Sequence, residues 1–224
     1  MENFEFSIIL PAYNQGELLK KGIEKIKEAF ADMVEVIIVD DGSTDNTLEI
    51  VKKLSNVKII KNPCNMGKGY SVKNGMLSAR SKYWIFTDAD LPYGVEGIKK
   101  ILEKIENDYD IAVGQRVNPY PQNPVRAFCH KIFNFFIRKY LKIPFKDTQC
   151  GLKGFKADIA EKIFKNLTIN GFAFDIELLC FALKKNYKIC IVDVEQLTHT
   201  VSTITLKDLF KIVKDVRKIK KIYL

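Results

Sequence analysis

The sequence predicts an α/β fold with a mainly parallel central sheet and helices on both of its faces. Apolar runs of strand length, such as 34–41, alternate with segments of helical apolar spacing, such as 17–31. These runs are continuously apolar, which is typical of strands that are buried between two layers of helices. Acidic residues and glycines follow several runs directly, and ligands of such sheets bind beyond the carboxyl ends of the strands.

The first half of the chain is expected to alternate strictly between strands and helices. The predicted strands are 6–14, 34–41, 57–62, 83–88 and 110–116. The predicted helices are about 17–31, a segment after 44, about 68–80 and about 95–107. Ser43 or Thr44 is predicted to cap the second helix, because a hydroxyl oxygen accepts a hydrogen bond from a free N–H group at a helix start.

From residue 117 the pattern changes. The segment "VNPYPQNPVR" (117–126) holds three prolines and indicates a loop. After it we expect an apolar, basic helix at 125–141, a strand and a helix within about 150–187, a strand at 189–195 and an amphipathic helix at about 205–222. The chain therefore predicts one domain that ends in a helical extension.

Composition narrows the class of protein without choosing a ligand. The 224 residues are 47% hydrophobic, enough for one sizeable core, and 36 Lys+Arg against 27 Asp+Glu give a net charge of +9. A basic balance favours a polyanion, a phosphorylated ligand or an anionic membrane surface. The five cysteines form no CxxC pair, so we expect reduced thiols rather than a zinc site. We expect neither a signal peptide nor a membrane-spanning helix.

Two strand ends carry paired acids. "IFTDADLPYG" (85–94) places Asp88 and Asp90 one residue apart, which suits Mg²⁺ or Mn²⁺ held against a nucleotide diphosphate. The alternative is a capping aspartate in a surface turn. "VIIVDDGSTDNT" (36–47) ends in two acids and a glycine, which suits a sugar hydroxyl or the edge of a base. The alternative here is an ordinary strand–turn–helix connection, which would account for Asp45.

Six segments together resemble family 2 glycosyltransferases of the GT-A fold. They are "ILPAYNQGELL", "VIIVDDGSTDNT", "NMGKGYSVKNGMLSA", "FTDADL", "VGQR" and "DTQCGLKGF", in that order within about residues 5–200. The likeness is greatest to the enzymes that charge dolichyl phosphate with glucose or mannose. It implies a catalytic GT-A domain at 1–200 and a C-terminal amphipathic extension at 201–224. It also implies inverting transfer of a hexose from UDP-glucose or GDP-mannose to a polyprenyl phosphate, with Mg²⁺ or Mn²⁺.

The resemblance also implies roles for individual residues. The nucleotide side comprises Pro11, Ala12, Tyr13, Glu17, Asp40, Gly67, Lys68 and the Asp88-Ala89-Asp90 motif, whose two acids flank the metal. The acceptor side comprises Arg116, Arg126, Asp147, Gln149, Cys150 and His199. The two arginines would receive the acceptor phosphate, and Asp147 would orient a substrate or act as the base for a hydroxyl acceptor. Pro92 departs from the family pattern, so water or phosphate oxygens would complete the metal's ligands.

Residues 125–142 and the last helix each combine an apolar face with basic residues, as in helices that lie in a lipid interface. The alternative for both is core packing or a dimer interface. We expect a protein bound peripherally to the cytoplasmic face of a membrane, with oligomerisation left open. No nucleic-acid motif occurs, so we expect no nucleic-acid partner. Two other functions stay open: transfer to a sugar hydroxyl in glycan synthesis, and non-catalytic binding of a nucleotide sugar.

Overall fold

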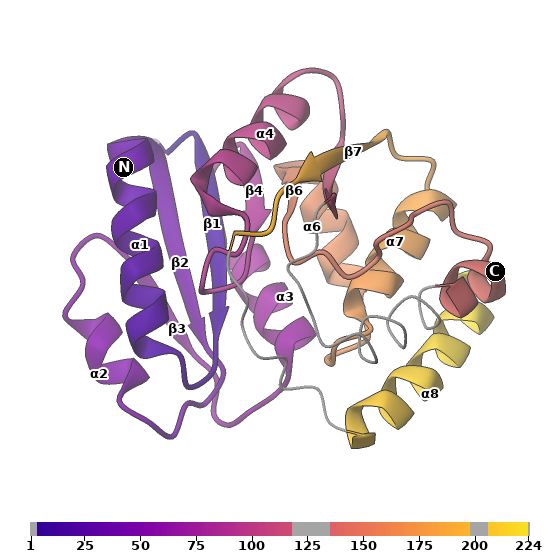
Figure 1. The fold of residues 1–224 in the computed structure, drawn as a ribbon, viewed down its shortest axis with the longest axis horizontal. Helices are drawn as coiled ribbons and strands as arrows, with labels where there is room; N and C mark the ends of the chain where they lie inside the picture. Colours follow the sequence, from indigo (N-terminus) through magenta and orange to yellow (C-terminus); the bar gives the residue numbers. More distant parts are fainter. Residues whose placement is uncertain (1–3, 118–134, 198–205, 224) are drawn as a thin grey trace.

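A seven-stranded sheet with helices on both faces forms the centre of the protein (Figure 1). The computed structural model describes residues 4–117, 135–197 and 206–223. The strand order is β3-β2-β1-β4-β6-β5-β7. Strand β6 runs antiparallel to β4 and β5, and the other neighbours pair in parallel. The predicted α/β fold with a mainly parallel sheet is therefore confirmed.

The elements lie within a few residues of their predicted positions. The strands are β1 (Phe6–Ala12), β2 (Val34–Asp40), β3 (Lys58–Lys61), β4 (Tyr83–Phe86), β5 (Ile111–Arg116), β6 (Lys153–Lys156) and β7 (Ile189–Val194). The helices are α1 (Gly16–Phe30), η1 (Ala31–Met33), α2 (Thr47–Lys52), α3 (Lys68–Ser78), α4 (Gly94–Glu106), α6 (Ala157–Asn166), α7 (Phe174–Lys184) and α8 (Leu206–Tyr223), and residues 135–141 are also helical. The segment 150–187 holds two helices where one was predicted.

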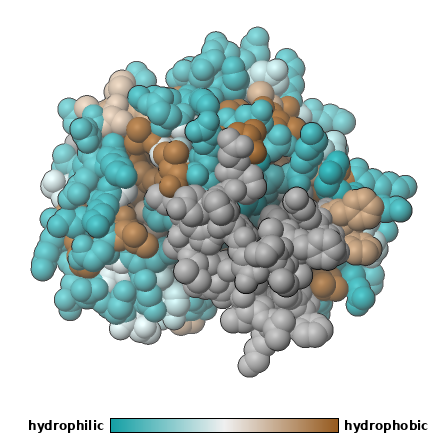
Figure 2. Space-filling view, viewed as in Figure 1, coloured by the Kyte–Doolittle hydropathy of each residue, from teal (hydrophilic) through white to brown (hydrophobic). Residues whose placement is uncertain are grey.

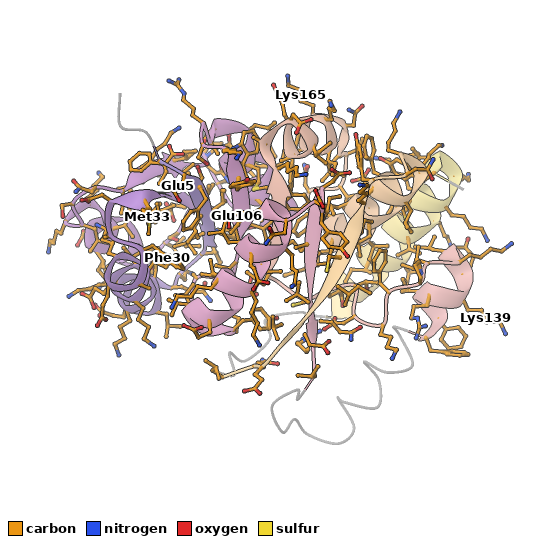
Figure 3. All side chains as sticks on the ribbon, turned by 90° about the horizontal axis from the view of Figure 1, so that it is seen from above. Glu5, Phe30, Met33, Glu106, Lys139 and Lys165 are labelled. Atoms are coloured by element: carbon orange, nitrogen blue, oxygen red, sulfur yellow. The ribbon has the colours of Figure 1, made fainter. Side chains whose placement is uncertain are left out.

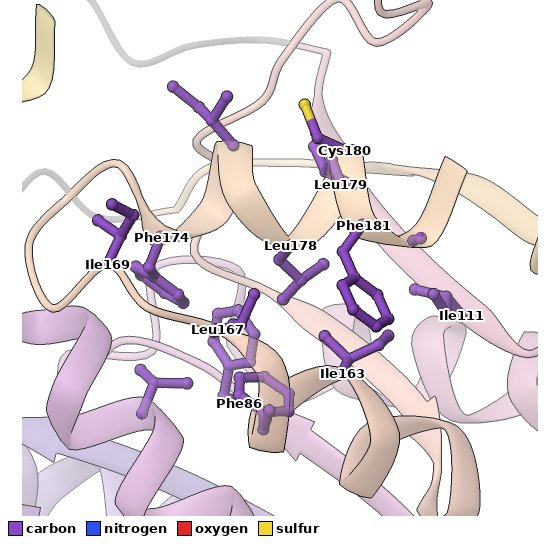
Figure 4. Close-up of a cluster of buried hydrophobic side chains, with 14 of the residues drawn as sticks. Phe86, Ile111, Ile163, Leu167, Ile169, Phe174, Leu178, Leu179, Cys180 and Phe181 are labelled. Atoms are coloured by element: carbon purple, nitrogen blue, oxygen red, sulfur yellow. The ribbon is translucent and has the colours of Figure 1, made fainter. Parts of the chain in front are cut away.

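Two hydrophobic cores cover the two faces of the sheet. Side chains alternate along each strand, so Ile8 faces the core under α1 and α4 while Ile9 faces the core under α3, α6 and α7. The view from above places Phe30 of α1 and Lys165 of α6 on opposite sides of the sheet (Figure 3). Beneath α7, the ring of Phe86 packs 5.7 Å from that of Phe174 (Figure 4). These cores hold the strands, and so fix where each strand ends.

The predicted cap of the second helix is wrong. Asn46 is the N-cap of α2, and Asp45 Oδ1 instead accepts a hydrogen bond from the Thr47 N–H at 2.9 Å. Ser43 and Thr44 serve the neighbouring turn: Ser43 Oγ accepts from the Asn14 N–H at 3.0 Å, and the Thr44 N–H donates to Asn14 Oδ1 at 2.8 Å. These contacts join the turn after β1 to the turn after β2.

The described part of α8 packs as a core helix. Ile212, Val216 and Ile219 are buried in the core that also contains α7, and the Tyr223 hydroxyl donates to Glu177 Oε1 at 3.3 Å. Residues 211–223 thus follow the core-packing alternative to a lipid interface. The division of the chain at residue 200 stays a prediction.

The helical residues 135–141 have one exposed and one buried side. Phe135 and Phe136 are 58% and 63% exposed, whereas Ile137 and Leu141 are buried. Among the residues that are coloured in Figure 2, hydrophilic ones cover most of the face drawn, with smaller hydrophobic areas between them. Within the described residues, no helix combines the length and apolarity needed to cross a bilayer.

Candidate active site

The carboxyl ends of β1, β2 and β4 bring the predicted donor-side residues to one edge of the sheet. Ala12 at the end of β1 lies beside Asp40 at the end of β2 in the parallel register. Strand β4 pairs with β1 on its other side, and the Thr87 N–H continues this pairing to the carbonyl of Ile9 at 3.1 Å. After β1 the chain continues to β2 on one side of β1, whereas β4 lies on the other side. Ligands of open α/β sheets bind at such a point, where the strand order reverses.

The adjacent acids at the end of β2 have different roles. Asp41 is saturated by protein donors: its Oδ1 accepts from Asn62 Nδ2 at 2.8 Å and the Met66 N–H at 2.9 Å, and its Oδ2 accepts from the Gly67 N–H at 2.9 Å. Asp41 therefore fixes the turn that leads into α3. Sequence reasoning placed Asp41 at a strand end but missed this role, which depends on residues more than twenty positions away.

Asp40 keeps an oxygen for a ligand. Its Oδ1 accepts from the Ser43 N–H at 3.2 Å, while Oδ2 is buried and has no hydrogen-bond partner among the described residues. A buried acceptor without a partner costs free energy, so the free Oδ2 of Asp40 indicates a ligand that donates a hydrogen bond to it. The hydroxyls of a ribose or the N–H groups of a base supply such donors.

Lys68 at the start of α3 forms an ion pair with Asp88 after β4. The Lys68 Nζ lies 2.5 Å from Asp88 Oδ1, and the two side chains are only 23% and 32% exposed. Gly67 before it has φ +99°, which admits the turn that presents the N–H groups of α3. Burial lowers the pKa of Lys68, but attraction by Asp88 and Asp175 outweighs it, and the net pKa is raised.

Arg116 at the end of β5 is clamped to Asp147. Arg116 Nε donates to Asp147 Oδ2 at 2.6 Å, and Nη2 donates to Oδ1 at 2.8 Å. Burial raises the pKa of Asp147, but the hydrogen bonds and charge of Arg116 outweigh it and lower the pKa. A carboxylate with a lowered pKa and two occupied oxygens is a weak general base.

The segment 147–151 closes the other side of Asp88. Cys150 is fully buried, and burial raises the pKa of its thiol. The Gly151 N–H donates to the Tyr93 hydroxyl at 3.3 Å, and burial also raises the pKa of Tyr93. A Cβ on Gly151 would overlap Asp88 Oδ2. Tyr93 was not predicted as a site residue, because only the fold brings it to Gly151.

The donor set at this edge fits Mg²⁺ or Mn²⁺. Asp88 and Asp90 supply hard carboxylate oxygens, which these ions prefer. Asp88 already binds a cation, the ammonium of Lys68. No group of three or more His, Cys, Asp or Glu side chains suited to a metal occurs within the described residues. Ligand oxygens or water would therefore complete the coordination.

A comparison with models of protein families shows to which family this chain belongs. The model of the family described as "Glycosyl transferase family 2" matches residues 7–164. The chain belongs to glycosyltransferase family 2. The resemblance identified from the six sequence segments is thereby confirmed.

Relatives of this family 2 glycosyltransferase carry a more specific name. A dolichyl-phosphate beta-glucosyltransferase of Dictyostelium discoideum is 35% identical, covering 87% of this chain and 67% of the relative. The protein of that name from Saccharomyces cerevisiae is 32% identical, covering 84% of this chain and 65% of the relative. The chain thus spans about two thirds of the length of these curated relatives.

A solved structure supports the GT-A type of fold. Glucosyl-3-phosphoglycerate synthase from Mycobacterium tuberculosis, in complex with Mn²⁺, UDP-glucose and phosphoglyceric acid, superposes with a TM-score of 0.75. The sequences are 16% identical, and the match covers 98% of this chain and 80% of that one. At this identity the likeness concerns the fold alone.

The remaining predicted residues of the family 2 glycosyltransferase surround this edge or lie outside the described residues. Pro11 is partly buried at the end of β1, Tyr13 beyond it is 42% exposed, and Glu17 is exposed in the first turn of α1. Gln149 is partly buried between Asp147 and Cys150. Arg126 and His199 lie outside the described residues, so their predicted contacts stay predictions.

Replacing Gly151 by Ala is expected to lower transferase activity roughly a hundredfold without unfolding the protein. The new Cβ would push the Asp88 carboxylate aside, and a displacement of about 1 Å in a catalytic group costs on the order of 10² in rate. Steady-state kinetics with a saturating donor measure the loss. Gly171→Ala is the matched control, because its Cβ would meet only the Lys211 side chain at 3.7 Å. Equal activities of the two variants would show that Asp88 need not be held in place.

Proposed function

We propose that this family 2 glycosyltransferase moves glucose from UDP-glucose to a polyprenyl phosphate of the dolichyl type, with inversion at the anomeric carbon. The observation that carries the proposal is the meeting of Asp40, Lys68 and Asp88 at one edge of the sheet. The names of the Dictyostelium and yeast relatives support the glucose and the lipid acceptor. The UDP-glucose and Mn²⁺ in the mycobacterial structure support the donor and the metal.

The donor side binds the negatively charged diphosphate of the sugar nucleotide, which gains further negative charge as it leaves. Asp88 and Asp90 would hold Mg²⁺ or Mn²⁺, which neutralises the charge that the departing diphosphate gains. Lys68 and the N-terminal N–H groups of α3 face the same edge and stabilise phosphate oxygens. The free oxygen of Asp40 accepts a hydrogen bond from the nucleoside. These contacts fix the anomeric carbon for attack from the opposite side.

The acceptor side needs positioning more than a base. A phosphate monoester is mostly ionised near neutral pH, since its second pKa is about 6. Its oxygen therefore attacks without giving up a proton. Asp147 holds Arg116 in one orientation through two hydrogen bonds, and Arg116 with Arg126 would receive the acceptor phosphate. The lowered pKa of Asp147 accords with this orienting role.

A labelled donor tests the proposal directly. The protein is incubated with Mg²⁺ or Mn²⁺, dolichyl phosphate and either UDP-[¹⁴C]glucose or GDP-[¹⁴C]mannose, and the products are partitioned between butanol and water. We expect label in the organic phase with UDP-glucose, and its loss when EDTA is added. Label that passes only to a water-soluble glycan would favour a hydroxyl acceptor instead. Binding of UDP-glucose without any turnover would favour the binding module.

We also propose that residues around 135–141 touch the cytoplasmic face of a membrane. Phe135 and Phe136 are exposed beside Lys139, an arrangement that suits insertion below anionic headgroups. Vesicles with 30% phosphatidylserine should sediment the protein, and Phe135→Ser/Phe136→Ser should reduce the bound fraction severalfold. Leu77→Ser, another exposed apolar position, is the control. Equal sedimentation of both variants would reject this contact.

A further inference from the structure

A row of alternating charges leads from the proposed metal site into the protein interior. Lys68 lies 2.5 Å from Asp88, and Lys153 lies 2.6 Å from Asp175. The two pairs are neighbours, because the start of α3 packs against the start of α7: a Cβ on Gly69, next to Lys68, would lie 2.7 Å from the Cβ of Phe174, next to Asp175. The Asp175 carboxylate also attracts the ammonium of Lys68. Asp88 and Lys68 were predicted from the sequence, whereas Lys153 and Asp175 have no part in the mechanism above. Both side chains are nevertheless buried next to the proposed metal site.

Lys153 and Asp175 form the inner of the two ion pairs, and several contacts hold this pair in place. The Lys153 side chain is 0% exposed, and its ammonium also donates to the carbonyl of Cys150 at 2.7 Å and lies 5.4 Å from the centroid of the Phe86 ring. Asp175 is 5% exposed and sits in the first turn of α7, where the helix dipole favours a negative charge. Lys153 thus fixes Asp175 and the backbone at Cys150, which adjoins Gly151 and Asp88.

Lys68 and Asp88 form the outer ion pair, and its ammonium would compete with a divalent cation for the Asp88 carboxylate. The ammonium of Lys68 is in contact with an Asp88 oxygen that Mg²⁺ or Mn²⁺ would take, and two cations repel each other at that distance. Lysine carries its charge on a flexible four-carbon stem, so Lys68 can withdraw without moving α3. The inner carboxylate that already attracts it is Asp175.

We propose that Lys68 competes with the divalent cation for Asp88, and that Asp175, fixed by Lys153, is the positioning residue that receives the Lys68 ammonium when the cation binds. This inference rests on the metal role in the proposed function. In the cation-free state Lys68 neutralises Asp88. In the loaded state its ammonium stays beside the diphosphate instead of leaving for solvent.

Binding of Mn²⁺ alone, without donor, tests the exchange. Free Mn²⁺ is followed by electron paramagnetic resonance for the wild type, Lys68→Met, Asp175→Asn and the double variant. We expect Lys68→Met to bind Mn²⁺ roughly fivefold more tightly, since it removes the competitor of a partly exposed ion pair. We expect Asp175→Asn to weaken binding severalfold, and much less so in the Lys68→Met background. The direct loss of one negative charge acts in both backgrounds and cancels in this comparison.

Asp175→Asn leaves Lys153 buried without its counter-charge, so the same titrations are repeated in Lys153→Met/Asp175→Asn. Thermal unfolding checks that each variant is folded. Mn²⁺ binding that is no tighter in Lys68→Met than in the wild type would overturn the inference. Equal effects of the Asp175 replacement with and without Lys68 would assign Asp175 a purely structural role and also overturn it. Failure of glucose transfer with these Mn²⁺ effects intact would count against the proposed function alone.

Discussion

Replacing Asp90 by Ala is expected to reduce glucose transfer about 10³-fold, which corresponds to about 4 kcal/mol of transition-state stabilisation. Asp90 lies in the turn after β4 and is partly exposed, so the change removes a carboxylate from the proposed metal site. The diphosphate would then leave without a properly held cation. Initial rates with UDP-glucose and dolichyl phosphate, measured over a series of Mn²⁺ concentrations, give the size of the loss.

Asp32→Ala is the matched control for this variant. Asp32 is exposed in η1, just before β2 begins, at the end of the sheet away from the site. We expect Asp32→Ala to keep wild-type rates. Thermal unfolding checks that both variants are folded at the assay temperature. Near-full activity of Asp90→Ala, or wild-type activity that persists in EDTA, would contradict the role given to the acidic pair.

The strand ends and the acids that follow them could be predicted because their signal is local. A continuously apolar run followed by acids marks both the strand and its end, as for Asp40 and Asp88. Lys153 and Asp175 carry no such signal, since "LKGF" and "FAFDIELL" become partners only when β6 and α7 pack together. Strand β6 also has only four residues, and Gly154 fits there because a Cβ would collide with Ile101.

Helix α8 shows a second limit of what the sequence can predict. An apolar stripe beside lysines suits a lipid interface and a protein core equally well, because both remove the stripe from water. In residues 211–223 the answer comes from α7, whose Phe181 ring meets that of Tyr223 at 6.0 Å between centroids. The apolar side chains of α7 are scattered all round the helix, as expected of a helix buried on every side.

Replacing Lys153 by Met is expected to lower the free energy of unfolding by about 3–5 kcal/mol, because it leaves the Asp175 carboxylate buried without a partner. Lys153→Met/Asp175→Leu should recover most of that loss, since a buried ion pair can often be replaced by apolar residues at little cost. Urea unfolding followed by circular dichroism measures both differences. Lys162→Met is the control: its pair with Asp158 is exposed on α6, so stability should barely change.

The double variant separates stability from function. If the inner pair served the core alone, a folded Lys153→Met/Asp175→Leu protein would transfer glucose normally. We expect it to be stable and yet severalfold slower, because the Lys68 ammonium has then lost the carboxylate that retains it next to the leaving diphosphate. If Lys153→Met were as stable as the wild type, the buried Asp175 carboxylate would have to take up a proton when it loses its partner. The charge on Asp175 would then be dispensable.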